Sequence, residues 1–217
     1  MAALKVWLIL VSLTPVAADI VGDEVRNDPA RGFNGGYYLE FLSLGLPFMA
    51  AFLEPGNTGW GRSVAGALEN YDKMSSVWVL GEDLAQERNA ITLHDSETDQ
   101  YGLPVPVVAK TPHNNDYEMT AHAYETTAQI YESVGAKDVY ELPAYPATHN
   151  MGTNRMHADA DKGVVNGYGQ AHDIDNLFVS DGSQFTSSGA CNPTLTIVAL
   201  TIRQAEYISQ EMNAQNI

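Results

Sequence analysis

Only one cysteine, Cys191, occurs among the 217 residues, so the chain cannot form an internal disulfide. Basic residues are also scarce, since 11 Lys and Arg stand against 27 Asp and Glu and the net charge is −16. No basic cluster offsets this charge, which excludes the classes of protein that bind nucleic acids or anionic membranes. The apolar run from Val6 to Leu13 is too short for a bilayer, which requires roughly 20 apolar residues. No other segment is a candidate for crossing a membrane.

Two motifs for cofactors and metals are incomplete. The stretch "NGYGQAHD" (166–173) has Gly167 and Gly169 but no third glycine at the spacing of a dinucleotide fingerprint, so we interpret it as a turn. The stretch "HADADKG" (157–163) has two aspartates but lacks the third acidic ligand and the closing glutamate of a calcium loop. The six histidines show no zinc-like spacing. We therefore expect a solvated acidic turn here and no metal site.

Residues 1–18 allow two interpretations. One lysine, an apolar run, Pro15 and a group of small residues fit a short signal peptide cleaved near Ala18. The alternative is an internal apolar strand or helix that became a terminus when a reading frame was cut short. The first interpretation implies a periplasmic or secreted protein and the second a cytoplasmic one. Both remain open at this point.

Several short segments have the pattern of β-strands. The hydrophobic content is 45%, which is typical of a folded chain with a core. A hairpin is expected at residues 89–110, and Pro104 and Pro106 place its return strand at an edge or a bulge. Single strands are expected at residues 37–43, 74–80 and 176–183.

Two long helices are expected as well. The first covers residues 115–134, with Gly135 at its C′ position and an apolar face formed by Tyr124, Ala128, Tyr131 and Val134. The second runs from Pro193 to about Met212, and its apolar first half should be buried. Strands and helices alternate without a steady βαβ rhythm, which favours an α+β fold with a mostly antiparallel sheet flanked by helices.

The start of the last helix, within "GACNPTLTIVALTIR", has two explanations. Asn192 is a favoured N-cap residue and Pro193 a favoured first helical residue, so the segment can simply be a well-capped core helix. A helix N-terminus also presents N–H groups and partial positive charge, which would stabilise an anion. Cys191 could be a nucleophile, but its neighbours match no signature of thiol enzymes, and a packing role is favoured. His149, taken alone, is an ordinary loop histidine.

Taken together, these loops and this helix start resemble the C-terminal part of the glucose–methanol–choline (GMC) flavin oxidoreductases. The family's H-x-x-G-T, D-G-S and N-P-T segments are matched, in the same order, by His149, Gly152 and Thr153, by Asp181, Gly182 and Ser183, and by Asn192, Pro193 and Thr194. Upstream, "NAITLHDSETDQYGLPVP" is similar to a hairpin of the family. The resemblance covers about residues 20 to 215. The stretch "THNMGTNRM" (148–156) is most similar to the sugar and polyol dehydrogenases of the family, such as gluconate dehydrogenase flavoprotein subunits.

The resemblance implies a division of the chain into parts. Residues 19–175 would form a substrate-binding domain. Residues 176–217 would be a return segment whose strand and helix complete an FAD-binding domain. The glycine-rich loop that holds the FAD diphosphate in family members does not occur in this sequence. The implied partners are therefore an amino-terminal FAD-binding half or an electron-accepting subunit, together with an alcohol or sugar substrate.

The resemblance also implies an activity, the oxidation of a CH–OH group by hydride transfer to FAD. His149 would be the general base that takes the hydroxyl proton, a role to which imidazole is suited near neutral pH. Asn192 would hydrogen-bond the substrate oxygen. The implied cofactor-binding residues are Asp181 and Gly182 near the diphosphate and ribityl chain, and Pro193 and Thr194 beside the flavin pyrimidine edge.

Two other classes of function stay open beside this one. The chain could be an inactive truncated fragment, which the missing glycine-rich half favours. It could also be a secreted, non-catalytic sugar-binding module, which the signal-like N-terminus favours. The residues do not identify the alcohol, the electron acceptor or the oligomeric state.

Overall fold

A computed structural model of the chain describes residues 29–42, 62, 65, 69, 73–137, 139, 141 and 149–217. Contacts divide the chain into two compact units, each described here by itself. The first comprises residues 1–81 and 117–146, and the second comprises residues 82–116 and 147–217. Residues 1–18, for which a signal peptide was one interpretation, lie outside the described residues.

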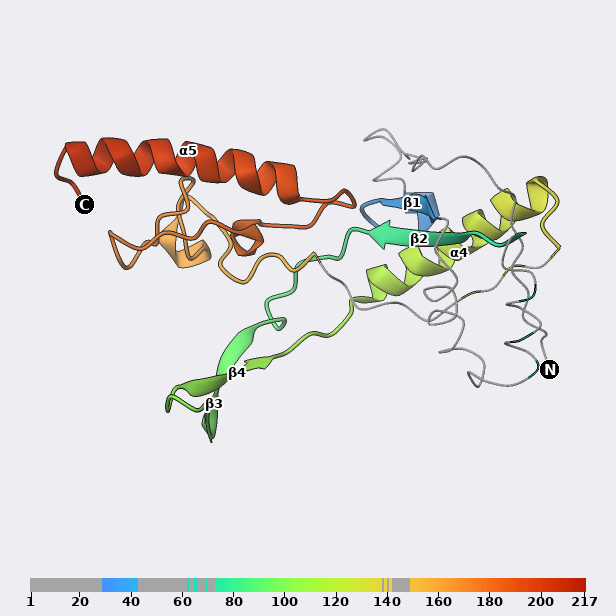
Figure 1. Ribbon diagram of the computed structural model, residues 1–217, viewed down its shortest axis with the longest axis horizontal. Coiled ribbons are helices and arrows are strands. Elements are labelled where there is room, and N and C mark those ends of the chain that lie inside the picture. Colours follow the sequence, from blue (N-terminus) through green and yellow to red (C-terminus); the bar gives the residue numbers. More distant parts are fainter. Residues whose placement is uncertain are drawn as a thin grey trace. The chain divides into compact units, whose positions relative to one another are not determined.

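In the first unit, one helix packs on a pair of antiparallel strands. Strand β1 (Tyr37–Leu42) pairs with β2 (Ser76–Gly81), which confirms the strands expected at residues 37–43 and 74–80. Helix α4 (Asn114–Ser133), which belongs to this unit from Tyr117 onwards, lies along this pair (Figure 1). Its apolar side chains join those of β1 in one core cluster, whose buried members are Phe33, Tyr37, Leu39, Met119 and Ala123.

The end of α4 is the one that the sequence predicts. Gly135 has a φ of 83°, its N–H donates to the carbonyl of Glu132, and the N–H of Ala136 donates to the carbonyl of Tyr131. These two bonds form a Schellman motif, which satisfies carbonyl groups at the helix end. Of the residues on the predicted apolar face, Tyr131 is buried and Val134 is 48% exposed.

In the second unit, the expected hairpin is present. Strand β3 (Ile91–Thr98) pairs antiparallel with β4 (Pro104–Val108). The register shifts between Leu93 and Thr98, and these two residues pair with Pro106 and Pro104. Because proline has no N–H for the ladder, the irregularity confirms the prediction of an edge or bulge at this strand.

Residues 149–193 fold mainly as loops joined by short hydrogen-bonded pieces. Two 3-10 turns occur, η3 (Ala160–Lys162) and η4 (Gly182–Gln184). The strand expected at residues 176–183 is wrong, because only a single bridge joins Phe178 to Gln170. Backbone bonds join the N–H of Ala171 to the carbonyl of Leu177 and the N–H of Val179 to the carbonyl of Gly169. The carbonyl of Val179 accepts instead from the side-chain amide of Gln204. Segment 166–170 is a turn, as expected, with Gly169 at a φ of 73°.

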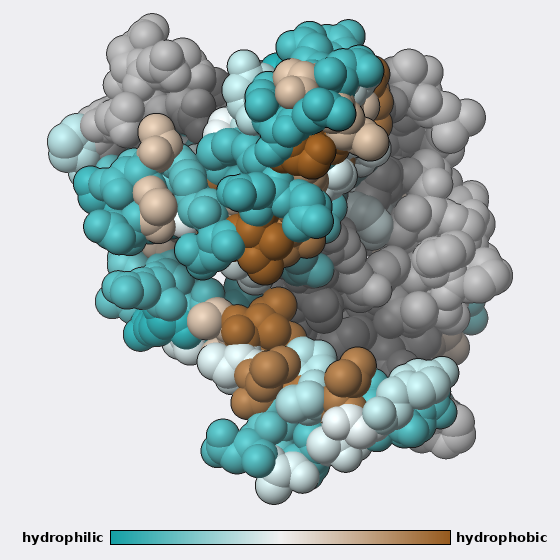
Figure 2. Space-filling model, turned by 90° about the vertical axis from the view of Figure 1, so that its left-hand side faces the viewer, coloured by the Kyte–Doolittle hydropathy of each residue, from teal (hydrophilic) through white to brown (hydrophobic). Residues whose placement is uncertain are grey.

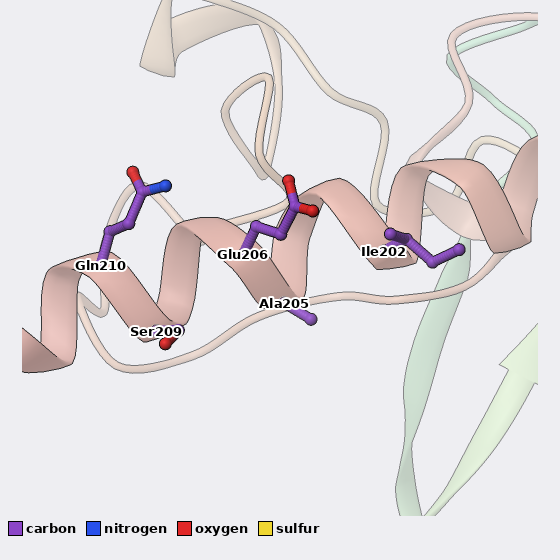
Figure 3. Close-up of a pocket in the computed structure, with 5 residues that line it drawn as sticks. All are labelled: Ile202, Ala205, Glu206, Ser209 and Gln210. Atoms are coloured by element: carbon purple, nitrogen blue, oxygen red, sulfur yellow. The ribbon is translucent and has the colours of Figure 1, made fainter.

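Helix α5 (Thr194–Asn213) follows these loops in the second unit, and Gln204 is the one buried residue of this helix. The expectation that its first half is buried is wrong, because Leu195 is 85% exposed and Ile202 is 58% exposed. Ile202 lines a shallow groove on this helix with Ala205, Glu206, Ser209 and Gln210 (Figure 3). The apolar sequence thus predicted the helix. It did not predict how much of the helix surface the rest of this unit covers.

The described residues form a small α+β structure with antiparallel strands, as expected. The strands make two separate pairs, β1–β2 and β3–β4, in place of the single flanked sheet that was predicted. Among the helices in the described ranges, none combines the length and apolar character that a bilayer crossing requires.

Candidate functional site

The segment that follows His149 is hydrogen-bonded to the Asp-Gly-Ser segment. The backbone N–H of Asn154 donates to the carbonyl of Ser183 at 2.9 Å, and its side-chain amide donates to the Ser183 hydroxyl at 3.0 Å. The N–H of Met156 donates to the carbonyl of Gln184 at 2.8 Å. Residues 149–156 and 181–184, about 30 positions apart in sequence, therefore lie side by side.

Gly182 is the point at which both segments meet the first turns of α5. A β-carbon at this position would lie 3.3 Å from the carbonyl oxygen of Asn150, next to His149 in sequence. The same atom would lie 3.5 Å from Cδ1 of Ile197 in α5 and 3.5 Å from Cγ of Met151. Gly182 is itself buried, so its backbone packs against the side chains of Met151 and Ile197. Gly182 thus lies against the two residues that follow His149 and against α5 three residues after Thr194.

Asp181 holds the turn that carries Gly182. Its Oδ1 accepts from the N–H of Ser183 at 2.7 Å and caps the 3-10 turn η4. The hydroxyl and then the backbone N–H of Ser183 lower the pKa of the Asp181 carboxyl, because both groups stabilise its charged form. Since Asp181 is exposed, the carboxylate remains accessible from solvent.

The start of α5 differs by one residue from the prediction. Pro193, and not Asn192, occupies the N-cap position, and no side chain makes a capping hydrogen bond. Asn192 and Thr194 are exposed, while Pro193 is half-buried. The N–H of Ile197 donates to the carbonyl of Pro193 at 3.0 Å, so the N–H groups of residues 194–196 precede the intrahelical ladder. These groups give the helix start a partial positive charge in a position open to an anionic group.

The packing role favoured for Cys191 is wrong, because this cysteine is exposed. His149 is half-buried. In the acidic turn, Asp159 accepts from the N–H of Asp161 and forms an ion pair with Lys162 at 3.0 Å. In the part of the chain that the structure describes, no group of three His, Cys, Asp or Glu side chains is placed to hold a metal.

Sequence reasoning missed two residues at which α5 joins the loops that precede Asp181. Gln204 is 3% exposed and its side chain makes three hydrogen bonds across the second unit. Gly169 lies directly against this side chain. The available signal was weak: Gln204 lies one helical turn after Thr201 on the face of α5 that packs on the loops.

Comparison with known proteins identifies the family. The family model described as GMC oxidoreductase matches residues 85–201, more than half of the chain. The chain belongs to the GMC oxidoreductase family. The matched range contains both His149 and the start of α5, so the resemblance inferred from three short segments is confirmed.

Relatives match this chain over most of its length. The 2-methyl-1,2-propanediol dehydrogenase of Mycolicibacterium austroafricanum is 35% identical over 87% of this chain and 35% of its own length. The gluconate 2-dehydrogenase flavoprotein of Pantoea cypripedii is 25% identical over 89% of this chain and 33% of its own length. The fructose dehydrogenase large subunit of Gluconobacter japonicus is 28% identical over 63% of this chain and 25% of its own length. The chain therefore spans about a third or less of the length of these relatives.

Proposed function

We propose that this chain is the substrate-facing, catalytic part of an FAD-dependent oxidoreductase that oxidises a CH–OH group of a sugar, polyol or other alcohol. The observation that carries the proposal is the packing of Gly182 against both Asn150, beside His149, and Ile197, in the first turns of α5. Membership of the GMC family and the dehydrogenase names of its relatives support it.

The start of α5 fits a flavin. No side chain caps the helix, and the N–H groups of residues 194–196 precede the ladder, so a partial positive charge is directed outwards. In this proposal Pro193 and Thr194 would hold the flavin ring, and Asp181 and Gly182 would hold the diphosphate and ribityl part. When bound, FAD supplies the hydride acceptor, and the protein supplies orientation and charge stabilisation.

The chain's own side chains then handle the substrate. His149 takes the proton from the substrate hydroxyl, since a half-buried imidazole can act as a general base. Asn192, exposed at the helix start, hydrogen-bonds the same substrate oxygen and orients the carbinol carbon. The hydrogen bonds from Asn154 to Ser183 keep the His149 loop at a fixed distance from the Asp181 turn.

The division of the chain follows from this function. Residues 19–175 provide the substrate-binding part, and residues 176–217 provide the return segment that completes the FAD-binding domain. The remaining two thirds of a typical relative's length would include the amino-terminal FAD-binding half. An electron-accepting subunit is a further partner, since relatives include a flavoprotein and a large subunit.

The test compares His149→Ala with the wild-type chain, using His157→Ala as a control, because His157 is exposed outside the three segments. Each purified chain is supplied with FAD, and flavin reduction is followed anaerobically with 2-methyl-1,2-propanediol, gluconate and fructose as probes. We expect His149→Ala to retain flavin and to reduce it about 10²-fold or more slowly, the usual effect of losing a general base. Normal reduction in His149→Ala would remove His149 from this role.

A chain that takes up no flavin is tested again as a fusion to the amino-terminal part of the 35%-identical dehydrogenase. If the fusion is also colourless, the flavin proposal is wrong. A colourless chain that binds sugar then supports the binding module, and one that binds none supports the inactive fragment.

A further inference from the structure

Gln204 is a buried amide on a helix whose other polar side chains are mostly exposed. It is 3% exposed, and its Nε2 donates to the carbonyl of Tyr168 at 2.9 Å and to the carbonyl of Val179 at 2.8 Å. Its Oε1 accepts from the hydroxyl of Ser180. Both amide protons and the amide oxygen are thus used, in three different directions.

These partners belong to two separate segments. Tyr168 lies in the turn at residues 166–170, while Val179 and Ser180 lie in the segment that leads into Asp181. The two segments are joined to each other by the bond from the N–H of Val179 to the carbonyl of Gly169 at 2.8 Å. One turn earlier in α5, the hydroxyl of Thr201 donates to the carbonyl of Ser180 at 3.2 Å. Gln204 is therefore the junction of the helix, the turn and the segment.

The neighbouring backbone leaves just enough space for this amide. Gly169 has a φ of 73°, and a β-carbon there would collide with Nε2 of Gln204 and lie 2.6 Å from the carbonyl oxygen of Val179. A directional, three-partner contact in such a confined space permits only a narrow range of helix positions. The stacked rings of Tyr168 and Tyr207, 4.2 Å apart at 9°, lie on the same side of α5 but have no comparable directionality.

The junction lies close to the candidate site along both chains that it connects. Ser180 is two residues before Gly182, and Gln204 is seven residues, about two helical turns, after Ile197. Gly182 and Ile197 are the residues that meet at the start of α5. A shift of α5 along segment 178–182 would therefore move Ile197 away from Gly182.

We propose that Gln204 is a positioning residue, which sets the position of α5 along segment 178–182 and so holds the start of α5 against Gly182 and the His149 loop. Its importance for catalysis rests on the proposed function. Its effect on the geometry of the helix start does not, and that effect can be measured without a flavin.

The test uses Cys191, the only cysteine of the chain, which is exposed two residues before Pro193. A nitroxide attached to its sulfur reports the mobility of the helix start by electron paramagnetic resonance. Gln204→Met keeps the size of the side chain and removes its three hydrogen bonds. Gln210→Met is the matched control, because Gln210 is exposed on the same helix (Figure 3).

We expect the Gln204→Met spectrum to shift towards the mobile component and the Gln210→Met spectrum to match that of the wild type. Amide hydrogen exchange should accelerate at Val179 and Ile197. It should stay unchanged in β1, in β2 and in the part of α4 that belongs to the first unit, whereas a general loss of stability would accelerate exchange there too. An unchanged Gln204→Met spectrum, or an equal shift in both variants, would overturn the proposal. If Gln204→Met does not fold, Ser180→Ala, which removes one of the three bonds, is judged by the same criteria.

A flavin-loaded preparation tests the catalytic part separately. Gln204→Met should slow flavin reduction by substrate while flavin content stays the same. An unchanged rate, together with a mobile label, would retain the geometric role and overturn the catalytic one. A chain that binds no flavin bears on the proposed function alone.

Discussion

At the scale of single residues, two glycines close to the candidate site have different tasks. Gly182 lets three segments pack closely, since a β-carbon there would approach the Asn150 carbonyl oxygen to 3.3 Å. Gly169 combines a left-handed backbone with a close approach, because a β-carbon there would lie 2.6 Å from the carbonyl oxygen of Val179. The second position is therefore much less tolerant of any side chain.

Three glycine-to-alanine variants separate backbone strain from steric conflict. Gly169→Ala introduces both left-handed backbone strain and a steric conflict. Gly135→Ala introduces only the strain, at a φ of 83°. Gly167→Ala introduces neither, because the space around this glycine is open and its φ is not left-handed. The left-handed strain costs about 1–2 kcal/mol. We expect Gly169→Ala to lose more free energy of unfolding than Gly135→Ala, and Gly167→Ala to change it little, as measured by urea denaturation. Equal losses at positions 169 and 135 would show that the contact with Val179 yields easily.

At the scale of elements, α4 and the β1–β2 pair depend on each other for burial. Leu39 on β1 is 2% exposed and Met119 and Ala123 on α4 are 3% and 0% exposed. A two-stranded pair is only marginally stable in water by itself, so the helix supplies the apolar surface that the strands require. The small side chain of Ala123 permits the close approach of helix and strands.

Enlarging Ala123 should therefore destabilise the first unit. Ala123→Leu adds three carbon atoms to a filled core, which typically costs about 1–3 kcal/mol. Ala121→Leu is the matched control, because Ala121 is exposed on the same helix. Denaturation followed by circular dichroism should show a lower midpoint for Ala123→Leu only. A neutral Ala123→Leu would mean that the helix can move away from the strands without loss.

At the scale of the whole molecule, the excess of acidic residues is the dominant property. The net charge is −16, and the ion pairs found among the described residues, Lys110–Asp83 and Lys162–Asp159, are largely exposed. Among the coloured residues of Figure 2, hydrophilic side chains predominate and hydrophobic ones form smaller patches. Exposed pairs contribute little to stability, so repulsion between acidic groups is only weakly offset.

Salt should therefore stabilise the folded chain. Raising sodium chloride from a few millimolar to about 0.15 M shortens the screening length to about 8 Å, which weakens repulsion among the acidic side chains. We expect the midpoint of thermal unfolding to rise by a few degrees, and potassium chloride to give the same curve at equal ionic strength. A midpoint that falls with salt would mean that attractive ion pairs outweigh the repulsion.

Much of the secondary structure was predictable because its causes are local. The aromatic strand at residues 37–42, the hairpin with its prolines and the glycine after α4 each depend on residues adjacent in sequence. The strand expected at residues 176–183 is reduced to one bridge at Phe178, and the next carbonyl, that of Val179, is bound by the side chain of Gln204 in another element. The candidate site residues came from family resemblance, and their roles stay predictions.

The amino-acid sequence alone was sufficient to establish the antiparallel α+β character, the acidic surface and the family, because period, charge and motif order are properties of the chain itself. The packing of Gly182 against the His149 loop and α5, the solvent-exposed side of α5 and the junction at Gln204 emerged only once the chain was folded. Each of these depends on atoms that are distant in sequence, and their approach is governed by packing and hydrogen-bond geometry that no local pattern records.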